Sequence, residues 1–261
     1  MYETLSLETD ARGVATLTLT RVDKHNAMSA LMIAELTKAA AQLAADTSVR
    51  VVVLTGAGAS FCAGGDLGWM QEQMRADGET RQAEARKLAE MLFALNTLPQ
   101  PVIGRIQGNA FGGGLGLISI CDVAIGVDTL KLGFTEARLG LIPATISPYC
   151  LARMGEAMAR RVFMSARLFG AAEAVTLGLL ARAVPADALD AAVEAEVAPY
   201  LACAPSAVAA SKRLARFMGP KIDKDVIDHS IRALAAQWET EEAAAGVEAF
   251  FAKRKAPWIN T

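Results

Sequence analysis

Hydrophobic and polar positions alternate over residues 4–7 and again over residues 14–19. A period of two places every second side chain on one face of a strand, so both stretches are typical of strands with one buried face. Asp10-Ala11-Arg12-Gly13 lies between them and has the composition of a tight turn. We therefore expect the chain to begin with a β-hairpin.

The hydrophobic period changes to that of a helix after Ser29. Apolar residues recur at helical spacing to residue 45, and a short β-branched run follows at residues 51–54. The same rhythm continues through residues 67–75 and 80–95 (helical), 102–106 (strand), a helix that opens at Gly112-Gly113-Gly114, and 123–127 (strand). No sequence repeat accompanies this rhythm, so the recurrence is one of architecture. The pattern predicts an α/β fold.

The composition shifts at Pro185 to alanine-rich segments with helical spacing. These segments cover residues 186–201, 206–217, 223–244 and 247–253, and we expect Gly246 to separate the last two. We divide the chain into a core over residues 1–200 and a helical region over residues 201–261.

Composition and charge narrow the classes of partner. The 261 residues are 53% hydrophobic and 21% charged, with a formal net charge of −2, so the chain can fill a substantial core and offers no basic footprint for nucleic acid. The amino terminus lacks a basic segment followed by a long apolar one, and no apolar run approaches the roughly 18 residues of a membrane span. We expect a cytoplasmic protein that binds neither nucleic acid nor membrane.

The cysteines and histidines give no sign of a metal site. Four cysteines lie far apart without a C-x-x-C pair, and two histidines cannot complete a plausible zinc set with them. We expect Cys62, Cys121, Cys150 and Cys203 to be buried reduced thiols and no metal to be bound.

Two glycine-rich loops carry the candidate chemistry. Phe61-Cys62-Ala63-Gly64-Gly65-Asp66 and Gly112-Gly113-Gly114 each follow a strand-like run and precede a helix-like one. Backbone N–H groups at such a junction have no helical carbonyl to bind, and glycine lets another molecule approach them closely. Two such junctions aimed at one point would form an oxyanion hole, with Glu136 downstream as a candidate acid or base.

Ordered motifs run along nearly the whole chain: Asn26-Ala27-Met28, residues 61–67, residues 108–114, Cys121-Asp122, Phe134-Thr135-Glu136-Ala137-Arg138-Leu139-Gly140, and residues 172–179 with Val184. In this order and at these separations they resemble the enoyl-CoA hydratase/isomerase (crotonase) superfamily. The resemblance implies a spiral of β-β-α units and a carboxy-terminal helical region that forms a homotrimer or a dimer of trimers.

The resemblance also implies roles for single residues. The Gly65 and Gly113 amides would hold the charge that develops on the carbonyl oxygen of a CoA thioester, and Glu136 would transfer a proton at the substrate. Coenzyme A would arrive as part of the substrate, so no further cofactor is implied. The residues expected to bind the CoA moiety are Lys24, Ala63, Asp66, Leu67, Gly114, Phe250 and Lys253, of which the last two resemble a segment that reaches a neighbouring subunit's CoA.

The chain departs from the family pattern at Gly116. Well-known hydratases have a second glutamate two residues after the glycine triplet, and the two carboxylates together hold the attacking water. Single-glutamate relatives include Δ3,Δ2-enoyl-CoA isomerases and hydratases of branched, carboxylated enoyl-CoAs. A third alternative is a CoA-thioester binding subunit that has lost catalysis.

Residues 139–149 favour the hydratase of a branched, carboxylated enoyl-CoA. This segment resembles that of bacterial methylglutaconyl-CoA hydratases and their isohexenylglutaconyl-CoA relatives, which act in leucine and acyclic terpene breakdown. Arg138 or Arg153 could meet the extra carboxylate, and Thr145, Ser147 and Tyr149 would add hydroxyl groups near the pocket.

Overall fold

The larger of two sheets carries the amino-terminal hairpin and the long strands. The computed structural model describes residues 1–259 and orders this six-stranded sheet β1-β2-β3-β5-β7-β10. Its strands are β1 (Leu5–Thr9), β2 (Val14–Leu19), β3 (Val51–Gly56), β5 (Val102–Ile106), β7 (Val123–Val127) and β10 (Arg182–Val184). The β1–β2 pair is antiparallel, which confirms the predicted hairpin, and every other pair is parallel.

The smaller sheet is built from strands that follow the long ones. Its four strands, in the order β4-β6-β8-β9, are β4 (Ser60–Cys62), β6 (Asn109–Phe111), β8 (Lys131–Gly133) and β9 (Phe169–Gly170). β3 leads to β4, β5 to β6 and β7 to β8, so each turn of the chain adds a strand to both sheets. The predicted β-β-α rhythm is confirmed, although runs of two or three residues were too short to predict as strands.

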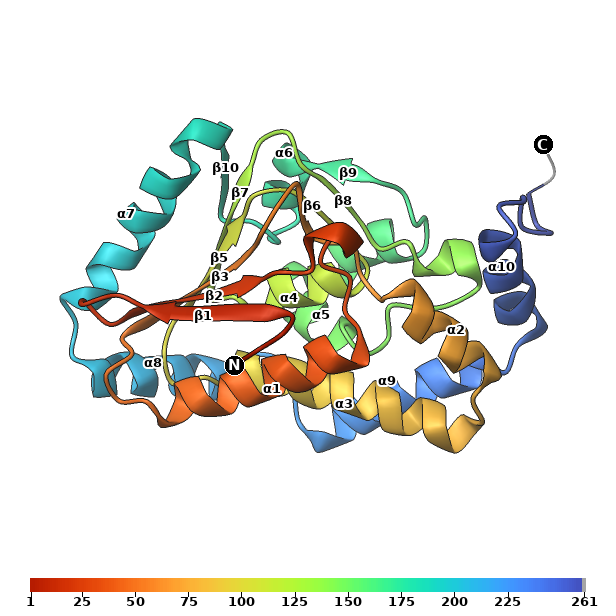
Figure 1. Ribbon diagram of the computed structural model, residues 1–261, viewed down its shortest axis with the longest axis horizontal. Coiled ribbons are helices and arrows are strands. Elements are labelled where there is room, and N and C mark those ends of the chain that lie inside the picture. The colour runs from red at the N-terminus through yellow and green to blue at the C-terminus, as the bar shows by residue number, and fades with distance from the viewer. Residues whose placement is uncertain (260–261) are drawn as a thin grey trace.

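Helices cover both faces of the larger sheet. The helices are α1 (Ala30–Ala45), α2 (Leu67–Arg75), α3 (Gly78–Asn96), α4 (Gly113–Ile120), α5 (Ser147–Phe163), α6 (Ala171–Thr176), α7 (Leu189–Leu201), α8 (Pro205–Met218), α9 (Lys224–Trp238) and α10 (Glu241–Phe251), with short 3-10 turns η1 (Val22–Lys24), η2 (Glu136–Leu139) and η3 (Ala186–Ala188). α7 packs on β3, β5 and β7, whereas on the opposite side α1 packs on α3 and α3 packs on α9 (Figure 1). None of the helices within residues 1–259 is long and apolar enough to cross a bilayer.

The break in the carboxy-terminal helices differs from the prediction. The helix expected over residues 223–244 ends at Trp238, and Thr240 caps the next helix by accepting a hydrogen bond from the Ala243 amide. Gly246 was predicted to separate two helices but lies inside α10. Glycine is required there because a Cβ would stand 2.6 Å from the Leu139 carbonyl group. The glycine permits close packing of α10 on η2.

Three of the four cysteines are buried as expected, and Cys203 is exposed. Cys203 lies just beyond the end of α7 and donates through its Sγ to the Pro199 carbonyl at 3.4 Å. The position after a helix end faces solvent here, which the count of cysteines could not reveal.

Candidate active site

The two glycine loops meet because their strands are neighbours. β4 and β6 pair in parallel, so the loops after Cys62 and Phe111 leave the sheet at the same edge. Gly64 adopts φ +93°, and a Cβ there would lie 2.9 Å from the Phe111 carbonyl oxygen and 3.7 Å from the Gly113 nitrogen. Only glycine allows the two loops to approach this closely.

Hydrogen bonds on either side of Gly65 fix its amide without using it. The Met28 amide donates to the Gly64 carbonyl at 2.7 Å, and the Asp66 amide donates to the Met28 carbonyl at 3.0 Å. In the described part of the chain, the Gly65 N–H donates to no backbone carbonyl. Gly113 is the first residue of α4, where an amide has no partner within the helix. Both glycines line one cavity of about 560 Å³.

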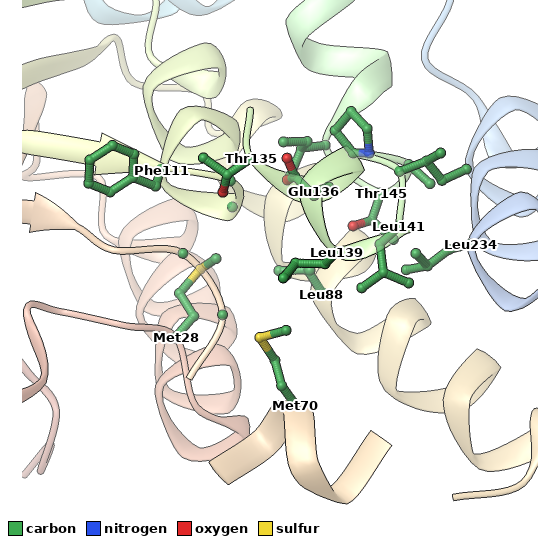
Figure 2. Close-up of a pocket in the computed structure, with 18 of the residues that line it drawn as sticks. Met28, Met70, Leu88, Phe111, Thr135, Glu136, Leu139, Leu141, Thr145 and Leu234 are labelled. Carbon is green, nitrogen blue, oxygen red and sulfur yellow. The ribbon is translucent and has the colours of Figure 1, made fainter. Parts of the chain in front are cut away.

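Glu136 contributes a buried carboxyl group to the same cavity. It begins η2, which follows β8 after Phe134 and Thr135. The buried Phe134 ring packs 4.5 Å from that of Phe163 and anchors the segment. Oε1 lies 3.0 Å from where a Cβ on Gly112 would stand, so the carboxyl group sits against the second glycine loop. Figure 2 shows Glu136 and Thr135 on one wall of the pocket, with Met28 and Met70 facing them.

Burial changes the chemistry of this carboxyl group. Part of the Glu136 residue is accessible, but Oε2 is fully buried and has no hydrogen-bond partner within residues 1–259. Removal from water disfavours the charged form and raises the pKa of Glu136 to about 7, a change that the residue's own amide opposes. A carboxyl group with this pKa can both take and return a proton near neutral pH.

The rest of the cavity is mostly apolar. Its wall combines α3, η2, the loop before α5, α9 and α10 of the same chain, through side chains that include Leu88, Leu139, Leu141, Ile146, Leu234, Trp238 and Phe250. Glu136 and Arg138 are the charged side chains among the lining residues that the structure describes. Leu234 and Trp238 were not predicted to line a site, because apolar residues at helical spacing are expected to pack in the core.

Some of the residues expected to bind CoA line the cavity and others do not. Ala63, Leu67 and Phe250 line the cavity, and Phe250 does so in its own chain because α10 folds back onto η2. Lys24 and Lys253 are exposed and do not line the cavity.

Asp66 and Gly114 support the wall from behind. The Asp66 carboxylate accepts from the Gly68 and Trp69 amides, which caps α2, and pairs with Arg21 at 2.9 Å. A Cβ on Gly114 would lie 2.5 Å from the Cys62 carbonyl oxygen, so this glycine lets α4 pack against β4. Neither residue is among those that line the cavity.

Only some of the polar side chains expected to contact the acyl group line the cavity. Arg138 and Thr145 line the cavity, whereas Arg153 lines a separate one and donates through Nε to the Ser119 carbonyl at 3.2 Å. Ser147 donates to the Ala144 carbonyl and Tyr149 to the Ala89 carbonyl, so both hydroxyl groups serve packing. The expectation for Arg153, Ser147 and Tyr149 was therefore wrong, because spacing along the chain does not show which face of α5 meets the cavity.

The described residues contain no group of three or more His, Cys, Asp or Glu side chains placed to hold a metal ion. Among the residues that line the cavity, Glu136 has no second carboxylate beside it.

Comparison with known proteins agrees with this geometry. The family model described as enoyl-CoA hydratase/isomerase matches residues 9–261. The chain belongs to this family. It is similar to a Rhizobium meliloti protein named "Probable enoyl-CoA hydratase", at 34% identity over 273 residues that cover 98% of this chain and 97% of that protein.

Solved structures of family members share the fold. An enoyl-CoA hydratase from Shewanella pealeana superposes with a TM-score of 0.81 at 36% identity, over 98% of this chain and 96% of that one. An enoyl-CoA hydratase from Mycobacterium avium gives a TM-score of 0.86 at 29% identity, over 99% of this chain and all of that one, 100%. The family member described here is thus an enzyme of the crotonase superfamily, with a mixed α/β fold and carboxy-terminal helices.

Proposed function

We propose that the chain is an enoyl-CoA hydratase that adds water to a branched, carboxylated 2-enoyl-CoA. The observation that carries the proposal is the buried, unpartnered Glu136 carboxyl group against the Gly112–Gly113 loop, in a cavity that Gly65 also lines. Donors that are fixed before the substrate arrives stabilise developing charge without reorganising, and one such donor contributes roughly 100- to 1000-fold in rate in other enzymes.

The proposed reaction passes one proton through Glu136. The ionised carboxylate takes a proton from water as the water oxygen bonds to C3 of the enoyl group. The electron pair of the double bond moves to the thioester oxygen, where the Gly65 and Gly113 amides hold the charge. The neutral Glu136 then gives its proton to C2, the thioester carbonyl re-forms, and the carboxylate is regenerated.

Arg138 supports the carboxylated substrate. Within residues 1–259 its guanidinium group forms no ion pair or hydrogen bond. Arg138 lines the cavity and follows Glu136 by two positions along η2. A guanidinium group binds a carboxylate through paired hydrogen bonds. The apolar wall around it suits the branched hydrocarbon part of the acyl group.

A turnover panel of crotonyl-, 3-methylglutaconyl- and isohexenylglutaconyl-CoA tests the substrate class. We expect higher kcat/KM for a carboxylated chain than for crotonyl-CoA, and Arg138→Gln should remove that preference while leaving crotonyl-CoA turnover within a few-fold. Equal kcat/KM on all three substrates would retire the carboxylated substrate and leave the hydratase class standing.

The same single carboxyl group would serve an isomerase. Purified enzyme given a 3-enoyl-CoA and, separately, a 2-enoyl-CoA distinguishes the two reactions. Formation of 2-enoyl product without hydration would replace our proposal by isomerisation, and binding without turnover of either substrate would indicate a non-catalytic subunit.

We also propose assembly as a homotrimer or a dimer of trimers. Leu214, Phe217 and Met218 are exposed apolar side chains on α8, with Phe217 at 81% exposure. Such a cluster supports burial against a second copy. Sedimentation equilibrium would measure the assembly, and a monomer at micromolar concentration would contradict it.

A further inference from the structure

Ile146 occupies the space beside Gly116 on α4. A Cβ on Gly116 would lie 2.5 Å from Ile146 Cγ2, closer than real Cβ atoms approach, and 3.0 Å from Ile146 Cβ. Ile146 lines the cavity at 2% exposure, whereas Gly116 is buried and does not line it. The isoleucine side chain therefore stands where a side chain from position 116 would have to pass to reach the cavity.

The isoleucine cannot easily yield this space. Its Cβ is branched, which restricts it to few rotamers, and its backbone is fixed at the N-cap position of α5, directly before Ser147. Leu92 Cδ1 lies 3.6 Å from the same Cβ position on Gly116 and closes a second side. A side chain at position 116 would displace close-packed atoms, so positions 116 and 146 are coupled.

We propose that Ile146 blocks the path by which a side chain at position 116 would reach the cavity, so that position 116 is held to glycine and Glu136 carries both proton transfers of the proposed hydration. The inference deepens the proposed hydratase and rests on it for its chemical part. Its steric part is independent of any activity. The Ile146 side chain also adds to the apolar wall of the cavity in which the Glu136 carboxyl group is held.

A double-mutant cycle in thermal unfolding tests the steric part. Gly116→Ala adds only a Cβ, and we expect it to lower Tm by about 3 to 10 °C in the wild-type background, as overpacking does in other cores. In an Ile146→Ala background, which removes the atom 2.5 Å away, the same change should have much less effect. Ile146→Val is the matched control, since it keeps both γ carbons and should preserve the loss. An equal loss of Tm from Gly116→Ala with Ile146 intact, with Ile146→Ala and with Ile146→Val would show that Ile146 does not block a side chain at position 116.

A carboxylate introduced at position 116 tests the chemical part. Gly116→Glu combined with Ile146→Ala should add a second ionisation to the pH profile of kcat/KM, while Gly116→Gln in the same background, of equal size, should not. Gly116→Glu with Ile146 intact should fold less stably and show the single ionisation of the wild type. A second ionisation with Ile146 intact, or none with Ile146→Ala, would overturn the inference.

The two proposals fail in different ways. If wild-type enzyme hydrates no enoyl-CoA, the proposed function falls, but the thermal cycle still reports whether Ile146 excludes a side chain. If hydration is observed and the cycle shows no coupling between positions 116 and 146, only this inference falls.

Discussion

At Glu136 the requirement for reactivity opposes stability. The pKa of the carboxyl group is about 7 in the folded chain, above its ordinary value of 4.5. Between these values the folded chain binds the proton more tightly than the unfolded one, so the free energy of unfolding falls as pH rises from about 4.5 to 7. At pH 8 the buried charge lowers the free energy of unfolding by about 3 kcal/mol, for a shift from 4.5 to about 7. We expect Glu136→Gln to raise Tm at pH 8 and to lose that advantage by pH 5.

Glu35 provides a matched control of opposite sign. It is also buried, but its carboxylate accepts from the Glu3 and Thr4 amides and the Thr4 hydroxyl group. Burial alone would raise the pKa of Glu35, and these hydrogen bonds lower it overall. Glu35→Gln should therefore lower Tm at neutral pH and matter less as the pH falls through the ordinary range of glutamate. A Glu136→Gln variant that behaves like Glu35→Gln would show that Glu136 is charged and stabilised in the fold.

The same Glu136 substitution should separate turnover from binding. Glutamine keeps the size of the side chain and cannot take a proton, so we expect kcat to fall by roughly 100- to 10,000-fold with acyl-CoA affinity little changed. Wild-type kcat/KM should fall as pH drops below about 7, because the ionised carboxylate starts the reaction. Steady-state kinetics from pH 5 to 9 and calorimetric titration measure both. A flat profile would show that another group carries the proton.

At the scale of elements, the turn from β6 into α4 depends on one special backbone position. Gly112 adopts φ +47°, and a Cβ there would meet the Glu136 carboxylate at 3.0 Å. A Cβ on the next residue, Gly113, would meet only the end of the flexible Met28 side chain, with Cε as the nearest atom. Gly112→Ala should cost about 1 to 3 kcal/mol of unfolding free energy, and Gly113→Ala distinctly less. Urea unfolding would compare them, and equal losses would contradict this account.

Substitutions of Asp66, at the start of α2, test whether this residue caps the helix or contacts CoA. Asp66 caps the helix and pairs with Arg21, so Asp66→Ala should cost about 1 kcal/mol for the lost cap. Asp66→Asn keeps a capping oxygen and should retain more stability. We expect KM for crotonyl-CoA to be unchanged in both variants when measured below their unfolding range. A several-fold rise in KM for both would show that the carboxylate contacts the substrate.

Sequence patterns predicted single helices and strands better than the contacts between them. The hairpin and the long strands were predictable, because alternation and β-branched runs mark them directly. The strands β4, β6, β8 and β9 were not, since two or three residues carry no period, although they bring the glycine loops together. Gly116 was noticed as a departure, but the role of Ile146 depends on a contact between α4 and the start of α5 that no local pattern records.

At the scale of the whole molecule, the carboxy-terminal helices complete the site of their own chain. Gln237 of α9 donates through Nε2 to the Gly140 carbonyl at 2.7 Å. A Cβ on Gly140 would lie 2.6 Å from the carbonyl group of Glu242, so α10 rests directly on the end of η2. The helix that carries Glu136 is thereby held between the small sheet and the carboxy-terminal region.

A substitution inside α10 should open this arrangement without disturbing the sheets. A Cβ on Gly246 would stand 2.6 Å from the Leu139 carbonyl group and from the Trp258 ring, so Gly246→Val should push α10 away from η2. We expect kcat/KM to fall by at least about 10-fold, because small displacements of a catalytic group are costly. Amide hydrogen exchange should become faster over residues 136–141 and 241–251 and stay unchanged in β3 and β5.

The control for this substitution lies on the outer face of the same helix. Ala244 is exposed on α10, so Ala244→Val introduces the same β-branched side chain without touching η2. Ala244→Val lowers helix propensity whereas Gly246→Val raises it, so a greater loss of activity in Gly246→Val cannot come from helix propensity. Ala244→Val should leave both kinetics and exchange close to wild type. If Gly246→Val also behaves like wild type, α10 is dispensable for holding Glu136, and the small sheet alone positions the carboxyl group. If both variants lose activity equally, the loss comes from a β-branched side chain anywhere on α10 rather than from its contact with η2.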